Sequence, residues 1–124
     1  MTSQWFHRSV AFVLLLPILV HAHGCGEPNT SEIVNVSLKN TETYHYPTVG
    51  GDEDGARIST QANHSSISEV RRNAETNWVA VYVYRPAAGF IGSDYAEVEI
   101  FTGSDGASAP TSIKKVAFRF VIHN

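Results

Sequence analysis

At 124 residues the chain allows one domain. Its formal net charge of −3 offers no basic surface that would recruit nucleic acid. Its single cysteine excludes an intrachain disulfide, so the fold must be stabilised by packing alone.

The first 22 residues have the pattern of a secretory signal peptide. Arg8 precedes an unbroken apolar run at 10–20, and the run leads into a small-residue exit, VHA, that ends at Ala22. The run is shorter than the roughly 20 residues that a membrane-spanning helix needs. We therefore expect cleavage after Ala22, secretion to the periplasm or cell surface, and a mature chain that begins at His23.

Two alternatives follow from the residues just beyond the apolar run. Cys25 stands where bacterial lipoprotein signals carry a lipid-modified cysteine, and lipidation there would place the protein on a membrane. A mature chain that begins at His23 would instead offer an α-amine and an imidazole as neighbouring nitrogen ligands, which suit copper(II). A small periplasmic copper-binding protein is thus the alternative function.

A flexible tether is expected at 23–31 and the folded domain at 32–124. Within the domain, short runs of alternating or β-branched residues recur with turn signals between them, and helical periodicity is absent. About six or seven strands are predicted, which implies an all-β fold of two packed antiparallel sheets. The clearest runs lie at 32–39, 41–47, 56–70 (two strands around a polar turn at 62–65), 78–84, 95–101 and 116–122.

The last two runs have the least ambiguous alternation. Glu97 and Glu99 must face water, which turns the residues that alternate with them toward the core. If these runs pair as a hairpin, Arg119 would lie near one of the two glutamates. The residues predicted to face the core are Ala96, Val98, Ile100, Val116, Phe118, Phe120 and Ile122.

The run at 78–84 leaves two orientations open, because both of its faces are apolar or aromatic. Either its valines face the core, or its aromatic side chains do. With the valines inward, the aromatic row becomes an exposed interaction surface of the kind enriched at interfaces. Otherwise that row is covered. The aromatic row consists of Trp78, Tyr82 and Tyr84.

The middle of the chain resembles the repeat of bacterial Ig-like, cadherin-like domains of cell-surface proteins. The resemblance covers roughly 56–101. It implies an Ig-like β-sandwich that serves as a spacer, adhesion or interaction module, and it does not imply an enzyme. The matching residues are Gln61, Asn63 and His64 in one turn, then Tyr84, Pro86, Gly89, Phe90, Gly92 and Asp94, and finally Val98 and Ile100.

The segment from Pro86 to Asp94 is predicted to be a structural corner. Pro86 lacks an amide proton and ends the preceding strand. Gly89 and Gly92 allow backbone angles that other residues resist. Phe90 can turn inward and plug the end of the sandwich, while the Asp94 carboxylate accepts hydrogen bonds from backbone amides in a turn.

Catalytic and metal-binding patterns are weak in the rest of the domain. Asp52, Glu53 and Asp54 fit no twelve-residue calcium loop and are predicted to be solvated turn carboxylates. The histidines lack the motifs of a hydrolase or a zinc protease. We therefore expect no catalytic residues, no cofactor, and a protein or glycan partner. The histidines within the domain are His45, His64 and His123.

Overall fold

The computed structural model describes residues 29–48, 55–103 and 107–124, and these residues form a seven-stranded β-sandwich. No helix in this part of the chain is long and apolar enough to span a membrane. A short 3-10 helix, η1 (Ala74–Thr76), links the fourth and fifth strands. The strands are β1 (Asn29–Lys39), β2 (Tyr44–Pro47), β3 (Gly55–Thr60), β4 (Ser65–Arg71), β5 (Val81–Pro86), β6 (Gly92–Thr102) and β7 (Ser112–His123).

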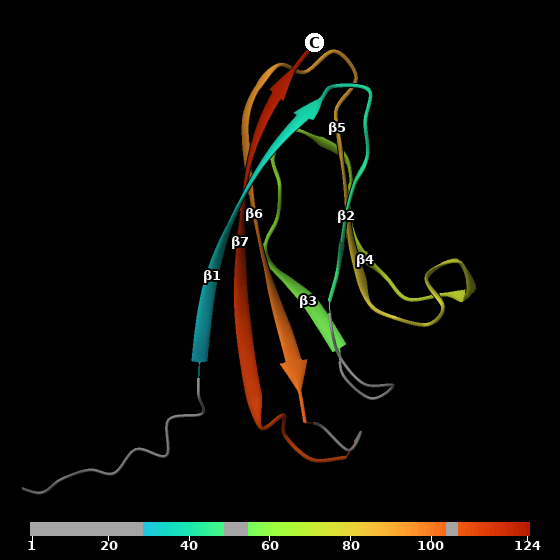
Figure 1. The fold of residues 1–124 in the computed structure, drawn as a ribbon, viewed down its shortest axis with the longest axis vertical. Coiled ribbons are helices and arrows are strands. Elements are labelled where there is room, and N and C mark those ends of the chain that lie inside the picture. The colour runs from blue at the N-terminus through green and yellow to red at the C-terminus, as the bar shows by residue number, and fades with distance from the viewer. Residues whose placement is uncertain (1–28, 49–54, 104–106) are drawn as a thin grey trace, which may run out of the picture.

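Two sheets form the two layers of the sandwich (Figure 1). One has four strands in the order β1-β7-β6-β3, and the other has three in the order β2-β5-β4. The predicted fold class, an Ig-like β-sandwich of six or seven strands, is confirmed. One pairing differs from expectation, because β1 runs parallel to β7 while all other neighbours are antiparallel.

Strand β1 begins earlier than the sequence predicts. It starts at Asn29, so 29–31 belong to the sheet and not to the tether. Its pairing with β7 runs from Asn29 opposite Ile113 to Lys39 opposite His123. The signal peptide and the rest of the tether lie outside the described residues.

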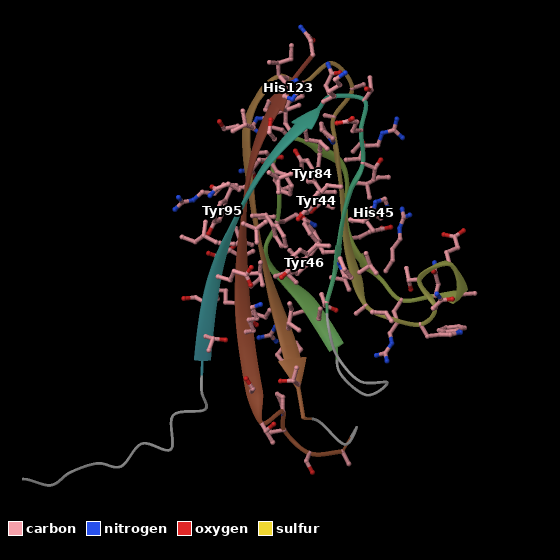
Figure 2. All side chains as sticks on the ribbon, in the orientation of Figure 1. Tyr44, His45, Tyr46, Tyr84, Tyr95 and His123 are labelled. Atoms are coloured by element: carbon pink, nitrogen blue, oxygen red, sulfur yellow. The ribbon has the colours of Figure 1, made fainter. Side chains whose placement is uncertain are left out.

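The core lies between the sheets and follows the predicted alternation of β6 and β7. All seven of their predicted inward side chains are buried. From the facing sheet, Tyr82 stacks on Phe118 with ring centroids 4.9 Å apart, and Tyr84 stacks on Phe120 at 3.8 Å. These ring contacts join the two sheets across the core. Figure 2 shows Tyr84 between the sheets.

The predicted hairpin of β6 and β7 is present, but its register corrects one expected contact. Arg119 lies opposite Tyr95, and not opposite Glu97 or Glu99. Lys115 takes the position opposite Glu99. The error arose because alternation determines which face a residue occupies but not how far one strand slides along the other.

Candidate functional site

The corner between β5 and β6 has the geometry that its residue types predict. Strand β5 ends at Pro86 and β6 begins at Gly92. Gly89 has a φ of 74° and Gly92 a φ of 139°, values that side chains strongly disfavour. Phe90 packs against the core, and its ring stacks on His64 with centroids 4.3 Å apart. The corner thus closes one end of the sandwich.

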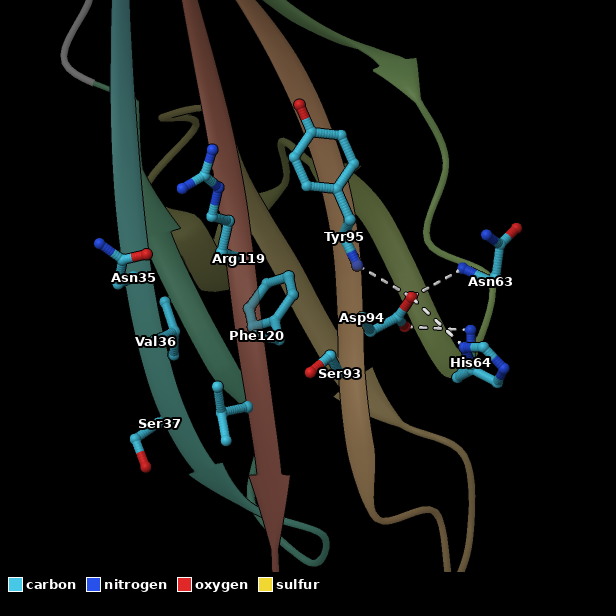
Figure 3. Close-up of a pocket in the computed structure, with 11 residues that line it drawn as sticks. Asn35, Val36, Ser37, Asn63, His64, Ser93, Asp94, Tyr95, Arg119 and Phe120 are labelled. Atoms are coloured by element: carbon cyan, nitrogen blue, oxygen red, sulfur yellow. Dashed lines mark hydrogen bonds and ion pairs between the residues drawn. The ribbon is translucent and has the colours of Figure 1, made fainter.

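Asp94 accepts the hydrogen bonds expected of it, and half of them come from a distant part of the chain. The backbone N–H groups of Asn63, His64 and Tyr95 each donate to its carboxylate at 3.0 Å. The Tyr84 hydroxyl, from the facing sheet, donates to it at 2.9 Å. The carboxylate therefore joins β6, the β3–β4 turn and β5 in one buried network. Figure 3 shows its bonds to Asn63, His64 and Tyr95.

This network also decides the charge of Asp94. Burial disfavours the carboxylate and alone would raise its pKa, but the four donors outweigh burial and hold the pKa of Asp94 below its ordinary value. Burial raises the pKa of Tyr84, and the bond to Asp94 raises it further. Asp94 is therefore an ionised hydrogen-bond acceptor, which leaves it poorly suited to take up a proton in catalysis.

His64 is the histidine nearest to this carboxylate. Its Nδ1 atom lies 3.6 Å from Asp94 Oδ1, and about half of its side chain is exposed. Among the described residues, no serine or threonine hydroxyl is hydrogen-bonded to the His64 ring. A nucleophilic mechanism needs such a hydroxyl next to the base. His64 is therefore a structural turn residue: its ring stacks on Phe90, and its backbone N–H donates to Asp94.

Beside this corner, the outer face of the four-stranded sheet carries a groove of about 670 Å³. Its volume lies within the range of about 300–1,000 Å³ that is common for small-molecule sites. Exposed side chains of β1, β7 and β6 line it, with the β3–β4 turn at its edge (Figure 3). The outward-facing residues of the groove are Asn35, Ser37, Ser93, Tyr95, Arg119 and Val121, and Asn63 and His64 lie at its edge.

The register of the strands arranges these side chains in two rows. Arg119 lies opposite Asn35 on one side and opposite Tyr95 on the other. In the adjacent row, Val121 lies between two serines in the same way, and 56% of Val121 is exposed. The groove therefore has a cation at its centre, an aromatic ring and polar hydrogen-bonding groups beside it, and an apolar floor.

Arg119 differs from Arg57 and Lys115, which form ion pairs on the same face. Among the described residues, no carboxylate forms an ion pair with Arg119. Glu97, the nearest acid of β6 on the same face, is already engaged: the Tyr95 hydroxyl donates to one of its oxygens, while Thr60 and Lys115 contact the other. The hydrogen bond from Tyr95 lowers the pKa of Glu97 and raises the pKa of Tyr95.

The aromatic row predicted as an interaction surface is not a single surface. Tyr82 and Tyr84 are completely buried, so of the two orientations left open by the sequence the one that exposes these two rings is wrong. They face inward because Phe118 and Phe120 of the opposite sheet supply rings for them to stack on. Trp78 remains 64% exposed, but it lies outside β5, in the loop after η1.

Trp78 is held in an unusual backbone conformation. Its φ is 63° and that of Asn77 is 51°, in the left-handed region that bulky residues avoid. The Trp78 amide donates to the Asn73 carbonyl at 2.9 Å, and Arg72 Nε donates to the Trp78 carbonyl at 2.7 Å. These bonds fix the loop and leave the indole ring in contact with solvent.

Several predicted features cannot be located. His23, Cys25 and the acidic residues 52–54 lie outside the described residues, so the copper, lipidation and calcium alternatives stay predictions. His45 and His123 are exposed on different sheets. Within the described ranges, no three His, Cys, Asp or Glu side chains gather where they could hold a metal ion.

Comparisons with known proteins leave the function open. No family model and no curated protein matches the chain. A cysteine protease inhibitor from Entamoeba histolytica is similar in structure, with 12% identity and a TM-score of 0.42 over 79% of this chain and 100% of that chain. An endo-fucoidan hydrolase of glycoside hydrolase family 107 has 12% identity and a TM-score of 0.44, over 74% of this chain and 13% of that chain. Likeness at this level assigns no activity.

Proposed function

We propose that this chain is a secreted, non-enzymatic binding module of the bacterial Ig-like, cadherin-like kind. It works in the periplasm or at the cell surface, through protein or glycan contacts made in the outer-face groove. One observation carries the proposal: the groove presents Arg119 to solvent, and no described carboxylate forms an ion pair with it.

The neighbouring corner supports a binding role over a catalytic one. Asp94 is the carboxylate closest to a histidine at this site, and its oxygens already accept four hydrogen bonds. Chemistry that used Asp94 would have to break the network that joins the two sheets. By contrast, Arg119 and Val121 on the outer face of β7 are exposed to solvent and available for a ligand.

Secretion is tested by the intact mass of the protein purified from its host. A mass that begins at His23 supports the predicted cleavage and keeps the copper alternative open. A mass that begins at a lipid-modified Cys25 places the protein on a membrane and removes that alternative. An uncleaved chain would contradict the secreted part of the proposal.

The contact surface is tested by probing arrays of glycans and peptides with three forms of the protein. The groove variant combines Tyr95→Ala with Arg119→Gln, and the control is Arg85→Gln, which removes an exposed cation from the other sheet. We expect the groove variant to lose the ligands that the wild type and the control retain. Equal binding by all three forms would move the contact surface away from the groove.

A further inference from the structure

We propose that the ligand of the groove is an acidic saccharide and that the Arg119 guanidinium binds its carboxylate. This inference rests on the proposed binding function and specifies the chemistry of the same site. It starts from the charge of the outer face, continues with the backbone beneath the groove, and ends with the side chains that line it.

The charges on the outer face of the four-stranded sheet fall into two halves. In the half next to β3, the charges are paired: Arg57 contacts Glu99 at 2.6 Å, and Lys115 contacts Glu97 at 3.6 Å. In the groove half, Arg119 faces solvent without such a pair among the described residues. A guanidinium binds a carboxylate through two parallel hydrogen bonds, so this half is complementary to an anionic ligand.

The protein as a whole carries a formal charge of −3, so its net charge does not attract an acidic ligand. Long-range repulsion acts against an acidic ligand, so its binding must depend on the local cation. This makes Arg119 the residue on which the preference for an acidic ligand depends.

The backbone beneath the groove favours a saccharide over a peptide. Strand β7 lies between β1 and β6, and β6 lies between β7 and β3, so both strands have a hydrogen-bonded neighbour on each side. An extended peptide gains most of its affinity by pairing with a free strand edge. The floor formed by β7 and β6 offers none, and the free edge of β1 lies at the side of the groove. Recognition on the floor must come from side chains.

The side chains of the groove suit a ligand rich in hydroxyl groups. Asn35 supplies both a donor and an acceptor, and the serine hydroxyls on either side of Val121 do the same. Tyr95 is 38% exposed and offers a ring face, while Val121 gives the floor an apolar contact. A sugar ring has an apolar C–H face and a rim of hydroxyls, which matches this combination.

The test is calorimetric titration of the processed protein with hexagalacturonate and with its fully methyl-esterified form. The two probes have the same sugars and the same length, and differ in charge. We expect the ester to bind at least about tenfold more weakly, the change associated with losing a charge-assisted hydrogen bond. Affinity for the acid should fall as salt is added.

Two variants with the same change of net charge provide the control. Arg119→Gln should weaken binding of hexagalacturonate by about tenfold or more, whereas Arg85→Gln should alter it by less than about twofold. Arg119→Lys keeps the charge but loses the planar fork, and should give an intermediate affinity. Thermal unfolding of each variant checks that the fold is intact.

Three results would overturn the inference. Equal affinity for the acid and the ester would exclude the carboxylate while leaving the groove as a contact surface. If hexaglutamate binds through Arg119 and hexagalacturonate does not bind, the ligand is an acidic peptide and not a saccharide. Absence of binding to hexagalacturonate at millimolar concentration would overturn the acidic-saccharide inference, whereas the proposed function is decided separately by the arrays.

Discussion

Asp94 and Tyr95 are neighbours in the chain, yet they belong to two regions of opposite character. Asp94 points inward into a network whose bonds join β6 to the β3–β4 turn and to β5. Tyr95 points outward into a groove whose central cation faces solvent. Because successive residues of a strand face opposite sides, one strand serves both regions. The carboxylate that resembles a catalytic group is therefore structural, and the surface open to a ligand lies one residue away.

Asp94→Ala should have the largest effect on stability. It removes the acceptor of three backbone amides and one buried hydroxyl, and leaves those donors without a partner. We expect a loss of about 3 kcal/mol in the free energy of unfolding, measured by urea denaturation. A variant as stable as the wild type would contradict the structural role of Asp94.

Acid should reproduce part of that loss. The pKa of Asp94 is held below its ordinary value of 3.8, so its stabilising contribution is present above that value and is lost as the pH falls through the lower pKa of the folded state. Asp94→Asn removes the titrating group. Its free energy of unfolding should therefore depend less steeply on pH below about pH 4 than that of the wild type. Parallel pH profiles would show that other carboxylates cause the acid loss.

Tyr84→Phe isolates one bond of the corner. The ring stays stacked on Phe120, and the hydroxyl that donates to Asp94 is removed. We expect a loss of about 1.5 kcal/mol in unfolding free energy, as for a hydrogen bond to a charged group. If Tyr84→Phe has the same cost in an Asp94→Ala background, the two side chains are not coupled and the network described above is wrong.

Arg119→Gln should have the smallest effect on stability. Because the side chain is exposed and no described carboxylate pairs with it, its replacement should change the free energy of unfolding by less than about 0.5 kcal/mol. Thermal and urea unfolding both measure this. A clear loss of stability would mean that Arg119 helps to hold the sheet together. It would contradict the assignment of stability to the corner and of binding to the groove.

The inward faces of β6 and β7 could be predicted from sequence because their polar and apolar residues alternate without ambiguity. Strand β5 could not, since Tyr82 and Val83 are both suited to burial and both are buried. Which of the two points toward the facing sheet depends on Phe118 and Phe120, which lie on that sheet. Alternation alone carries no information about what a facing sheet offers.

The groove was missed for a related reason. The sequence predicts that Arg119 faces outward, but its neighbours come from strands far away in the chain. Asn35 reaches it through a parallel pairing between the first and last described strands, which leaves no local signal. The corner was easier to predict because the turn residues of Pro86 to Asp94 are contiguous, although the amides that Asp94 binds lie about 30 residues earlier.

The division between a structural corner and a binding groove is tested most directly by amide chemical-shift mapping with hexagalacturonate. The account predicts saturable shifts that cluster around Asn35, Tyr95 and Arg119, with none around Arg85. Shifts that cluster on the loop around Trp78 would contradict it, and so would the absence of any shifts at a high ligand concentration.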